Sequence, residues 1–139
     1  MLTDKRHLPV LYTMLLTMPG IPSIYYGSEW GMEGKKGSGG EADYPLRKPM
    51  TKEAMEAGDQ ALMEHISKLA AFRKTSRALR YGSYTNVKEG NEQLVYAREC
   101  DGETVLVAFN IADHAADLSG SYNGKDYSVH LEAFESKIL

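Results

Sequence analysis

The sequence predicts an α+β chain in which a helical, loop-rich part precedes an all-β part. Apolar residues recur at helical spacing near residues 6–18 and 59–76, whereas after Ser76 the apolar period becomes two. The dipeptides Asp101-Gly102 and Asn123-Gly124 also separate alternating runs. Because a type I′ hairpin turn needs positive φ at both central positions, such dipeptides indicate tight hairpins. An antiparallel β-structure is therefore expected in the second half.

Composition excludes several classes of function. The chain has 139 residues, of which 42% are hydrophobic and 25% charged, the proportions of a protein that buries a core. A formal charge of −3 with scattered Lys and Arg gives no basic stripe, so no nucleic-acid partner is expected. The apolar stretch near residues 8–18 is too short to span a bilayer, and no small-residue cleavage site follows it. We therefore expect neither a membrane span nor a signal peptide. Cys100 is the single cysteine, which excludes an internal disulfide and a Cys-based zinc cage.

The first predicted helix, about residues 6–18, should be heavily buried. Its apolar residues at helical spacing are Leu8, Leu11, Leu15 and Met18, and a proline is tolerated in its first turn. The dipeptide at 19–20, Pro then Gly, ends it. Residues 21–26 then form a short apolar and aromatic run of strand length. Helix, turn and buried strand make an α/β unit.

Residues 27–58 are rich in glycine, proline and charge and predict a long loop, a kind of segment that is usually functional. Asp59 can cap a second helix, about residues 59–76. This helix is amphipathic, with Leu62, Ile66, Leu69 and Phe72 on one face.

Six strands at regular spacing follow, which argues for a small antiparallel sandwich. The predicted strands are residues 81–87, 93–99, 104–110, 116–122, 127–131 and 137–139.

Residues 19–29, which read PGIPSIYYGSE, carry a resemblance that covers nearly the whole chain. This wording resembles the last helix–strand unit of the catalytic barrel of glycoside hydrolase family 13 (α-amylase-like), closest to its cyclomaltodextrinase, neopullulanase and maltogenic amylase group. The resemblance implies that residues 1–76 are the C-terminal remnant of a (β/α)8 barrel, with residues 21–26 as its eighth strand. Residues 77–139 would be the antiparallel β-sandwich C-terminal domain.

The resemblance also implies that no catalytic residue lies in this chain. Retaining glycosidases use two carboxyl groups about 5–5.5 Å apart, and the family takes them from the fourth and fifth barrel strands. A third acidic residue belongs to a His-Asp pair that would fall just upstream of Met1. Asp4 and His7 flank a predicted helix start and do not match the family's Asn-His-Asp pattern. The chain alone should therefore be inactive, while the intact parent would retain configuration by double displacement.

Asp43 and Arg47 are the first candidate substrate-binding residues. The resembling group has an Asp and an Arg four residues apart in this loop, which bind glucose hydroxyls. A carboxylate accepts from two hydroxyls and a guanidinium donates in a fixed fork. The alternative is an exposed ion pair within the loop. Glu29 follows the expected strand at the end where barrel active sites lie, and the resemblance implies a supporting role for it rather than that of a catalytic acid.

Trp30 and Tyr44 could stack on a sugar ring or simply anchor the loop by packing. Tyr25 and Tyr26 belong to the expected barrel wall, from which one hydroxyl could reach the cleft. The histidines, at positions 7, 65, 114 and 130, lack metal-ligand spacing, and the glycines near residues 37–40 lack a following Gly-Lys-Ser/Thr. We therefore expect no metal, no cofactor and no phosphate loop.

Two functions remain in view. The first is the C-terminal portion of a hydrolase acting on α-glucans or maltooligosaccharides, and the second is a non-enzymatic β-module that binds glycan or a protein partner. An eighth strand without its neighbours would expose two edges, so self-association is expected. Linkage preference, calcium binding and localisation stay open in the sequence, although the resemblance favours the cytoplasm.

Overall fold

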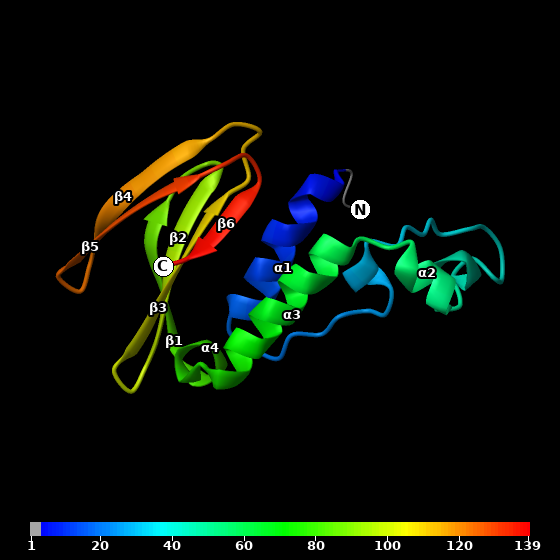
Figure 1. The fold of residues 1–139 in the computed structure, drawn as a ribbon, viewed down its shortest axis with the longest axis horizontal. Coiled ribbons are helices and arrows are strands. Elements are labelled where there is room, and N and C mark those ends of the chain that lie inside the picture. The colour runs from blue at the N-terminus through cyan, green and yellow to red at the C-terminus, as the bar shows by residue number, and fades with distance from the viewer. Residues whose placement is uncertain (1–3) are drawn as a thin grey trace.

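The computed structural model describes residues 4–139 and has an α+β fold with antiparallel sheets (Figure 1). Its helical elements are the 3₁₀ turn η1 (Lys5–His7), α1 (Leu8–Thr17), the 3₁₀ turns η2 (Ser28–Trp30) and η3 (Tyr44–Leu46), α2 (Lys52–Glu56), α3 (Gln60–Thr75) and α4 (Arg77–Tyr81). Its strands are β1 (Ser83–Glu89), β2 (Gln93–Cys100), β3 (Glu103–Asn110), β4 (Ala116–Tyr122), β5 (Lys125–Leu131) and β6 (Glu135–Ile138). None of the helices within residues 4–139 is long and apolar enough to cross a membrane.

The predicted first helix is present as α1, but it buries a different face from the one its leucines indicate. Its buried residues are Val10, Tyr12, Thr13, Leu16 and Thr17, whereas Leu11 is 50% exposed. The reason is that α1 has two partners: it contacts the large sheet on one side and α3 on another. Of the predicted stripe, Leu8, Leu15 and Met18 are partly buried against these partners, and Leu11 faces neither of them.

The strand predicted at residues 21–26 is wrong, because this segment has no regular secondary structure. Ile21 is 97% exposed and Tyr25 56% exposed, so the run is not buried either. A strand is held by hydrogen bonds to a neighbouring strand, and a barrel strand needs two such neighbours. Nothing within residues 4–139 pairs with this segment. Apolar composition alone therefore does not make it a strand here.

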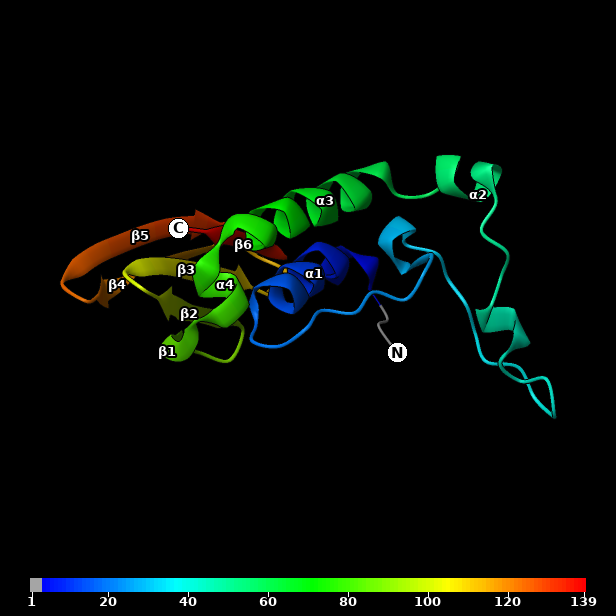
Figure 2. The same cartoon turned by 90° about the horizontal axis from the view of Figure 1, so that it is seen from below.

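The second helix is confirmed as α3, and the Asp59 side chain accepts a hydrogen bond from the Leu62 amide as predicted. Leu62, Ile66 and Leu69 are buried against α1. Phe72 is 38% exposed, and Arg73 instead continues the buried face into the last turn of the helix. Residues 27–58 form the expected long loop, interrupted by η2, η3 and α2, and Figures 1 and 2 show its part after η2 extending away from the rest of the molecule.

The six predicted strands are present with shifted ends. Four of them form a sheet in the order β1-β2-β3-β6, and β4 pairs with β5 in a separate two-stranded sheet; all pairings are antiparallel. Both predicted turns have positive φ at both positions: 50° and 84° at Asp101 and Gly102, 51° and 75° at Asn123 and Gly124. Local turn chemistry thus sets the register of two hairpins.

The four-stranded sheet separates two apolar cores. On one face, Tyr96, Val107 and Phe109 pack against Val10 of α1 and Leu79 of α4. The other face packs against the β4–β5 hairpin through a second set of buried side chains, Val95, Ala108, Leu118, Val129 and Leu131. Because alternate residues of β2 and β3 point to opposite faces, each strand serves both cores. The two sheets form the predicted sandwich. Helices cover the face of the four-stranded sheet that points away from the β4–β5 hairpin (Figures 1 and 2).

Helix α4 was not predicted, and a residue far along the chain holds its start. Ser76 caps it by accepting a hydrogen bond from the Leu79 amide. Glu103 of β3 accepts hydrogen bonds from the Arg77 and Ala78 amides and from the Ser76 hydroxyl. These hydrogen bonds lower the pKa of the Glu103 carboxyl, and the bond from the Ser76 hydroxyl has the largest effect. A carboxylate at a helix N-terminus satisfies amides that have no partner within the helix.

Candidate functional site

An open pocket of about 450 Å³ lies between the segment that follows α1 and the long loop. The rings of Tyr25 and Tyr26 line it from one side, with their centroids 4.8 Å apart. Asp43 and Arg47 line it from η3 and its flanks. The pocket therefore combines exposed aromatic rings with one carboxylate and one guanidinium.

Asp43 and Arg47 do not form the ion pair that the alternative interpretation expects. Asp43 is instead 3.3 Å from Lys36, and both of these side chains are more than half exposed. An ion pair so exposed contributes little to stability. Asp43 and Arg47 also line a neighbouring shallow pocket of about 400 Å³. Both side chains thus remain accessible to a ligand.

The surroundings of Tyr25 and Tyr26 in the pocket shift the pKa of Tyr26. Burial raises the pKa of the Tyr26 phenol, and a hydrogen bond with Tyr25 raises that pKa further, whereas the positive charge of Arg47 opposes the rise. Tyr26 is therefore a neutral hydroxyl at physiological pH, able both to donate and to accept a hydrogen bond.

Glu29 lies in η2, and it does not line the pocket that holds Asp43 and Arg47. One of its carboxylate oxygens, Oε2, is buried and meets no hydrogen-bond donor within the described part of the chain. Gly27 precedes it in the left-handed region with φ of 86°, where a side chain would also meet the Met32 sulfur at 2.8 Å. A glycine there is what allows the chain to turn sharply into η2.

Trp30 and Tyr44 occupy separate surroundings. The Trp30 carbonyl accepts a hydrogen bond of 2.9 Å from the Asp59 amide. Trp30 also lies close to Gly58, because a Cβ added at Gly58 would be 2.7 Å from the Trp30 Cβ. Trp30 thus packs the loop onto the start of α3. Tyr44 is 76% exposed and lines the shallow pocket beside Asp43. The structure brings Tyr44, Asp43 and Arg47 together and leaves Trp30 and Glu29 apart from them.

Two charged pocket residues, Lys48 and Glu33, had no signal in the sequence. Lys48 donates a hydrogen bond of 2.9 Å to the Glu33 carbonyl, and both residues line the larger pocket. They adjoin because the long loop folds back on itself, which neither periodicity nor a motif reports. An ion pair of 2.8 Å also joins Glu33 to Lys5, near the start of α1.

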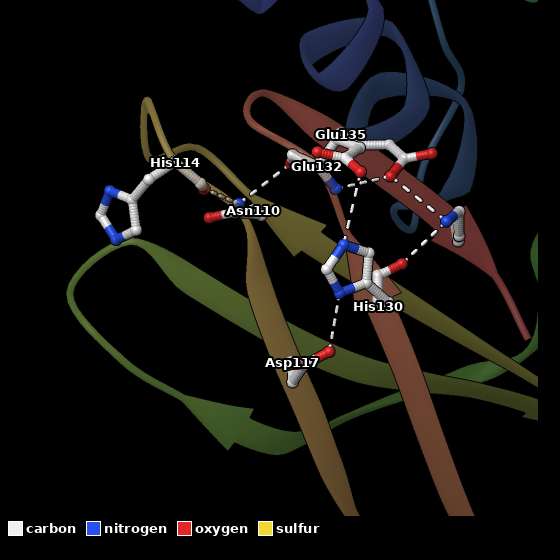
Figure 3. Close-up of polar contacts among 7 residues, drawn as sticks. Asn110, His114, Asp117, His130, Glu132 and Glu135 are labelled. Atoms are coloured by element: carbon white, nitrogen blue, oxygen red, sulfur yellow. Dashed lines mark hydrogen bonds and ion pairs between the residues drawn. The ribbon is translucent and has the colours of Figure 1, made fainter.

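His65 and His130 contact side chains and backbone groups of neighbouring elements. His65 of α3 lies 2.9 Å from the Thr13 hydroxyl and 3.1 Å from the Pro9 carbonyl, which joins α3 to α1. His130 of β5 contacts Asp117 at 2.7 Å and Glu132 at 3.4 Å (Figure 3). Across residues 4–139, no group of three His, Cys, Asp or Glu side chains could hold a metal ion.

Near His130, buried Asn110 forms hydrogen bonds that link the loop after β3 to the loop after β5. Its side-chain amide donates to the His114 carbonyl at 2.7 Å and to the Glu132 carbonyl at 3.0 Å (Figure 3). Its side-chain oxygen accepts from Gln93 and from the Ala112 amide. A buried amide with every donor and acceptor used stabilises a single loop arrangement. This cluster lies on the sandwich, and none of its residues lines the pocket described above.

The fold and the pocket define an α+β chain in which the segment after α1 and the long loop expose aromatic rings, a carboxylate and a guanidinium at one pocket. No family model matches the chain. It is 37% identical over 117 residues to a cyclomaltodextrinase from Geobacillus thermopakistaniensis, covering 83% of this chain and 19% of that protein. It is 34% identical over 107 residues to a cyclomaltodextrin glucanotransferase from Bacillus sp. (strain 38-2), covering 77% and 14%.

Solved structures agree with these relatives. The chain superposes on the maltogenic amylase from S. marinus with a TM-score of 0.81 and 28% identity, over 99% of this chain and 20% of that one. The γ-cyclodextrin glucanotransferase (CGTase) from alkalophilic Bacillus clarkii gives a TM-score of 0.78 and 29% identity, over 97% and 23%. The expected resemblance is thus confirmed: the chain is similar to the C-terminal part of glycoside hydrolase family 13 (α-amylase-like) proteins. It spans between 14% and 23% of the length of these four proteins.

Proposed function

We propose that this chain is the C-terminal portion of an α-glucan-acting glycosidase of the α-amylase family, and that it contributes part of a substrate cleft without the catalytic carboxyl groups. The observation that carries the proposal is the similarity to cyclomaltodextrinase over 83% of the chain, with the pocket of Asp43 and Arg47 inside the similar part of the fold. Residues 1–76 would be the remnant of a (β/α)8 barrel and residues 77–139 the C-terminal β-sandwich domain.

The chemistry of the pocket suits a glucose unit. The Asp43 carboxylate can accept from two adjacent hydroxyls, and the Arg47 guanidinium can donate to two ring or hydroxyl oxygens in a fixed geometry. The exposed faces of Tyr25 and Tyr26 offer apolar surface to the C–H faces of a sugar ring. A substrate hydroxyl would replace the exposed Lys36 at Asp43 at little cost.

The exposed apolar surface next to α1 supports the barrel part of the proposal. A groove of about 300 Å³ is lined only by apolar residues, Leu11, Met14, Leu15, Met18, Pro19, Ile21 and Pro22. Folded monomers rarely expose contiguous apolar surface of this kind without a partner. We propose that the other barrel strands and helices of the parent cover this groove. The donor for the buried Glu29 oxygen would come from the same part.

The first experiment measures hydrolysis of maltooligosaccharides and of cyclodextrins by the purified chain. We expect none, because a retaining glycosidase needs two carboxyl groups on either side of the scissile bond. Turnover that disappears when a single residue of the chain is changed would contradict the proposed inactivity.

The second experiment tests the substrate contact. Titration of isotope-labelled chain with maltotriose should shift the resonances of residues near the pocket, and Asp43→Asn and Arg47→Ala should each weaken that binding. Asp126→Asn is the matched control, because Asp126 is an exposed carboxylate on the β4–β5 hairpin, outside the pocket. If all three variants bind maltotriose as the unmodified chain does, the pocket is not the sugar site.

The alternative function, a β-module that binds glycan or a protein partner, has less support. Every lining residue of the larger pocket comes from residues 25–48, and none comes from the sandwich. Maltotriose shifts confined to residues 77–139 would favour this alternative over the first.

We also propose that the chain self-associates through the apolar groove. Ile21 is 97% exposed, and residues 21–24 make no backbone hydrogen bond within the described chain, so a second copy could pair with them. Light scattering over a range of concentrations should report a species larger than the monomer. Ile21→Asp should shift the chain toward monomer, whereas a monomer at every concentration in the unmodified chain would refute this proposal.

A further inference from the structure

Two buried arginines hold the C-terminal end of α1. Arg73 reaches from α3 and is 8% exposed. Its Nη1 donates to the Leu16 carbonyl at 2.8 Å and to the Met18 carbonyl at 3.1 Å, and its Nη2 donates to the Gly20 carbonyl at 2.6 Å. These carbonyls belong to the last turn of α1 and to the chain just beyond it. One planar guanidinium thus bridges three backbone carbonyls, in the last turn of α1 and just beyond it, that have no partner within the helix.

Arg98 reaches the same helix end from β2 and is 1% exposed. It donates to the Thr17 carbonyl at 2.5 Å, and to the Gly82 and Ser83 carbonyls at 2.9 and 3.1 Å. Neither arginine forms an ion pair with a carboxylate among residues 4–139. Backbone carbonyls and the negative end of the helix dipole balance both charges instead.

The two arginines differ in what lies downstream of their contacts. Arg98 touches α1 and the start of β1, whereas Arg73 also holds Gly20, the residue from which residues 21–26 depart. Within the described chain, the backbone hydrogen bonds of residues 19–26 are those from Arg73 to Gly20 and from Ser28 to Tyr25. Ser28 is itself fixed by the Tyr12 hydroxyl at 2.7 Å. Residues 21–24 are therefore held only at their two ends, by Arg73 at Gly20 and by Ser28 at Tyr25.

We infer that Arg73 is a positioning residue for Tyr25 and Tyr26. By fixing Gly20, it sets the path of residues 21–26 and so places the two rings opposite Asp43 at the pocket. The sugar-binding consequence rests on the function proposed above, whereas the anchoring of the segment does not.

The physical basis is the shape of the guanidinium. A lysine ammonium at the same position keeps the charge but cannot span three separated carbonyls from one rigid plane. At least one charge-assisted hydrogen bond to the segment is then lost, which should increase local opening of residues 21–26 about tenfold or more.

The test compares Arg73→Lys with Arg98→Lys in the full chain. Hydrogen exchange of the Ser28 amide, which donates to the Tyr25 carbonyl, and chymotryptic cleavage after Tyr25 and Tyr26 measure opening of the segment. We expect both to be about tenfold faster in Arg73→Lys, with exchange elsewhere in the chain unchanged. Arg98→Lys should weaken the whole chain without this local excess. Arg73→Gln removes the buried charge while keeping two donors, and it serves if the lysine variant does not fold.

Unchanged exchange in both Arg73 variants would overturn the inference, as would an equal acceleration in Arg98→Lys. Because exchange and cleavage need no sugar, they judge the anchoring separately from the glucan function. Maltotriose titration of the same variants judges the rest: weaker binding in Arg73→Lys with unchanged binding in Arg98→Lys supports the role in ring placement. If the unmodified chain does not bind maltotriose, the proposed function fails, and the exchange result still decides whether Arg73 anchors the segment.

Discussion

Gly82, at the junction of α4 and β1, is the position where adding one methyl group should harm the fold most. Its φ of −70° and ψ of 159° are ordinary extended values that alanine adopts freely. The obstacle is space: a Cβ at this position would lie 2.3 Å from the Ala78 carbonyl oxygen and 2.6 Å from the Glu99 carbonyl oxygen. Ordinary van der Waals contact begins at 3.4 Å. The backbone would thus have to move by about 1 Å away from two fixed elements.

The magnitude follows from what that movement disturbs. The Gly82 amide donates to Ala78 at 2.9 Å, and its carbonyl accepts from buried Arg98 at 2.9 Å. Weakening a backbone bond and a charge-assisted bond, in addition to steric strain, costs about 3 kcal/mol. Elsewhere, glycine to alanine at a compatible φ stabilises by about 0.4–1 kcal/mol through the unfolded state. The predicted sign is therefore the reverse of the general one.

Urea denaturation followed by circular dichroism measures the effect. With an m-value of about 1.5 kcal/mol per molar, a loss of about 3 kcal/mol lowers the midpoint by about 2 M. Gly40→Ala is one control, because no atom lies within 4 Å of its added Cβ and its φ is not positive. That variant should be near neutral, within about 0.5 kcal/mol. Gly124→Ala also has free space but a φ of 75°, so strain alone should cost about 1 kcal/mol.

This reasoning would be refuted if Gly82→Ala lost less than Gly124→Ala. Such a result would mean that the junction yields easily and that the close approach of α4, β1 and β2 does not constrain it.

Three further predictions concern single contacts. Asp117, through its hydrogen bond and its charge, raises the pKa of His130 above the ordinary 6.5, and Glu132 adds to the rise. The contribution of protonated His130 to folding stability is thus complete below about pH 6.5 and is lost as the pH rises through the raised pKa of His130. Urea midpoints should therefore fall over that pH range in the unmodified chain and should not fall in H130Q. Tyr96→Phe removes the buried hydrogen bond to Thr17 and should cost about 1 kcal/mol in the same assay; a loss near zero would show that the bond is not formed. Glu103→Gln weakens the cap of α4 and should also cost about 1 kcal/mol, with a smaller loss than wild type on acidification, because the carboxyl pKa is lowered in the fold and its contribution disappears as the pH falls.

The elements that depend on neighbouring residues in the sequence were predictable. The hairpins at Asp101-Gly102 and Asn123-Gly124 follow from the φ values those turns need, and α3 follows from its period and from the Asp59 cap. Each of these structures is decided within a few residues. Their ends shifted by one or two residues, as helix and strand ends commonly do.

The candidate site was predictable only in part. The spacing of Asp43 and Arg47 identified two of the pocket residues, because a resemblance to related loops reports on residues that act together. Lys48 and Glu33 were missed, since their proximity comes from the path of an irregular loop. No local signal distinguishes a loop residue that faces a pocket from one that faces solvent.

By itself, therefore, the sequence determined the class of the fold, the hairpin turns, the amphipathic α3 and the resemblance carried by residues 19–29, because each depends on local backbone preference or on a contiguous motif. Only the tertiary structure decided that residues 21–26 form no strand, that α1 buries Tyr12 and exposes Leu11, and that Arg73 and Arg98 meet at one helix end. Those outcomes depend on which segments are available to pair and pack. A strand needs a hydrogen-bonded neighbour and a buried face needs a partner surface, and neither requirement is written in the segment that has it.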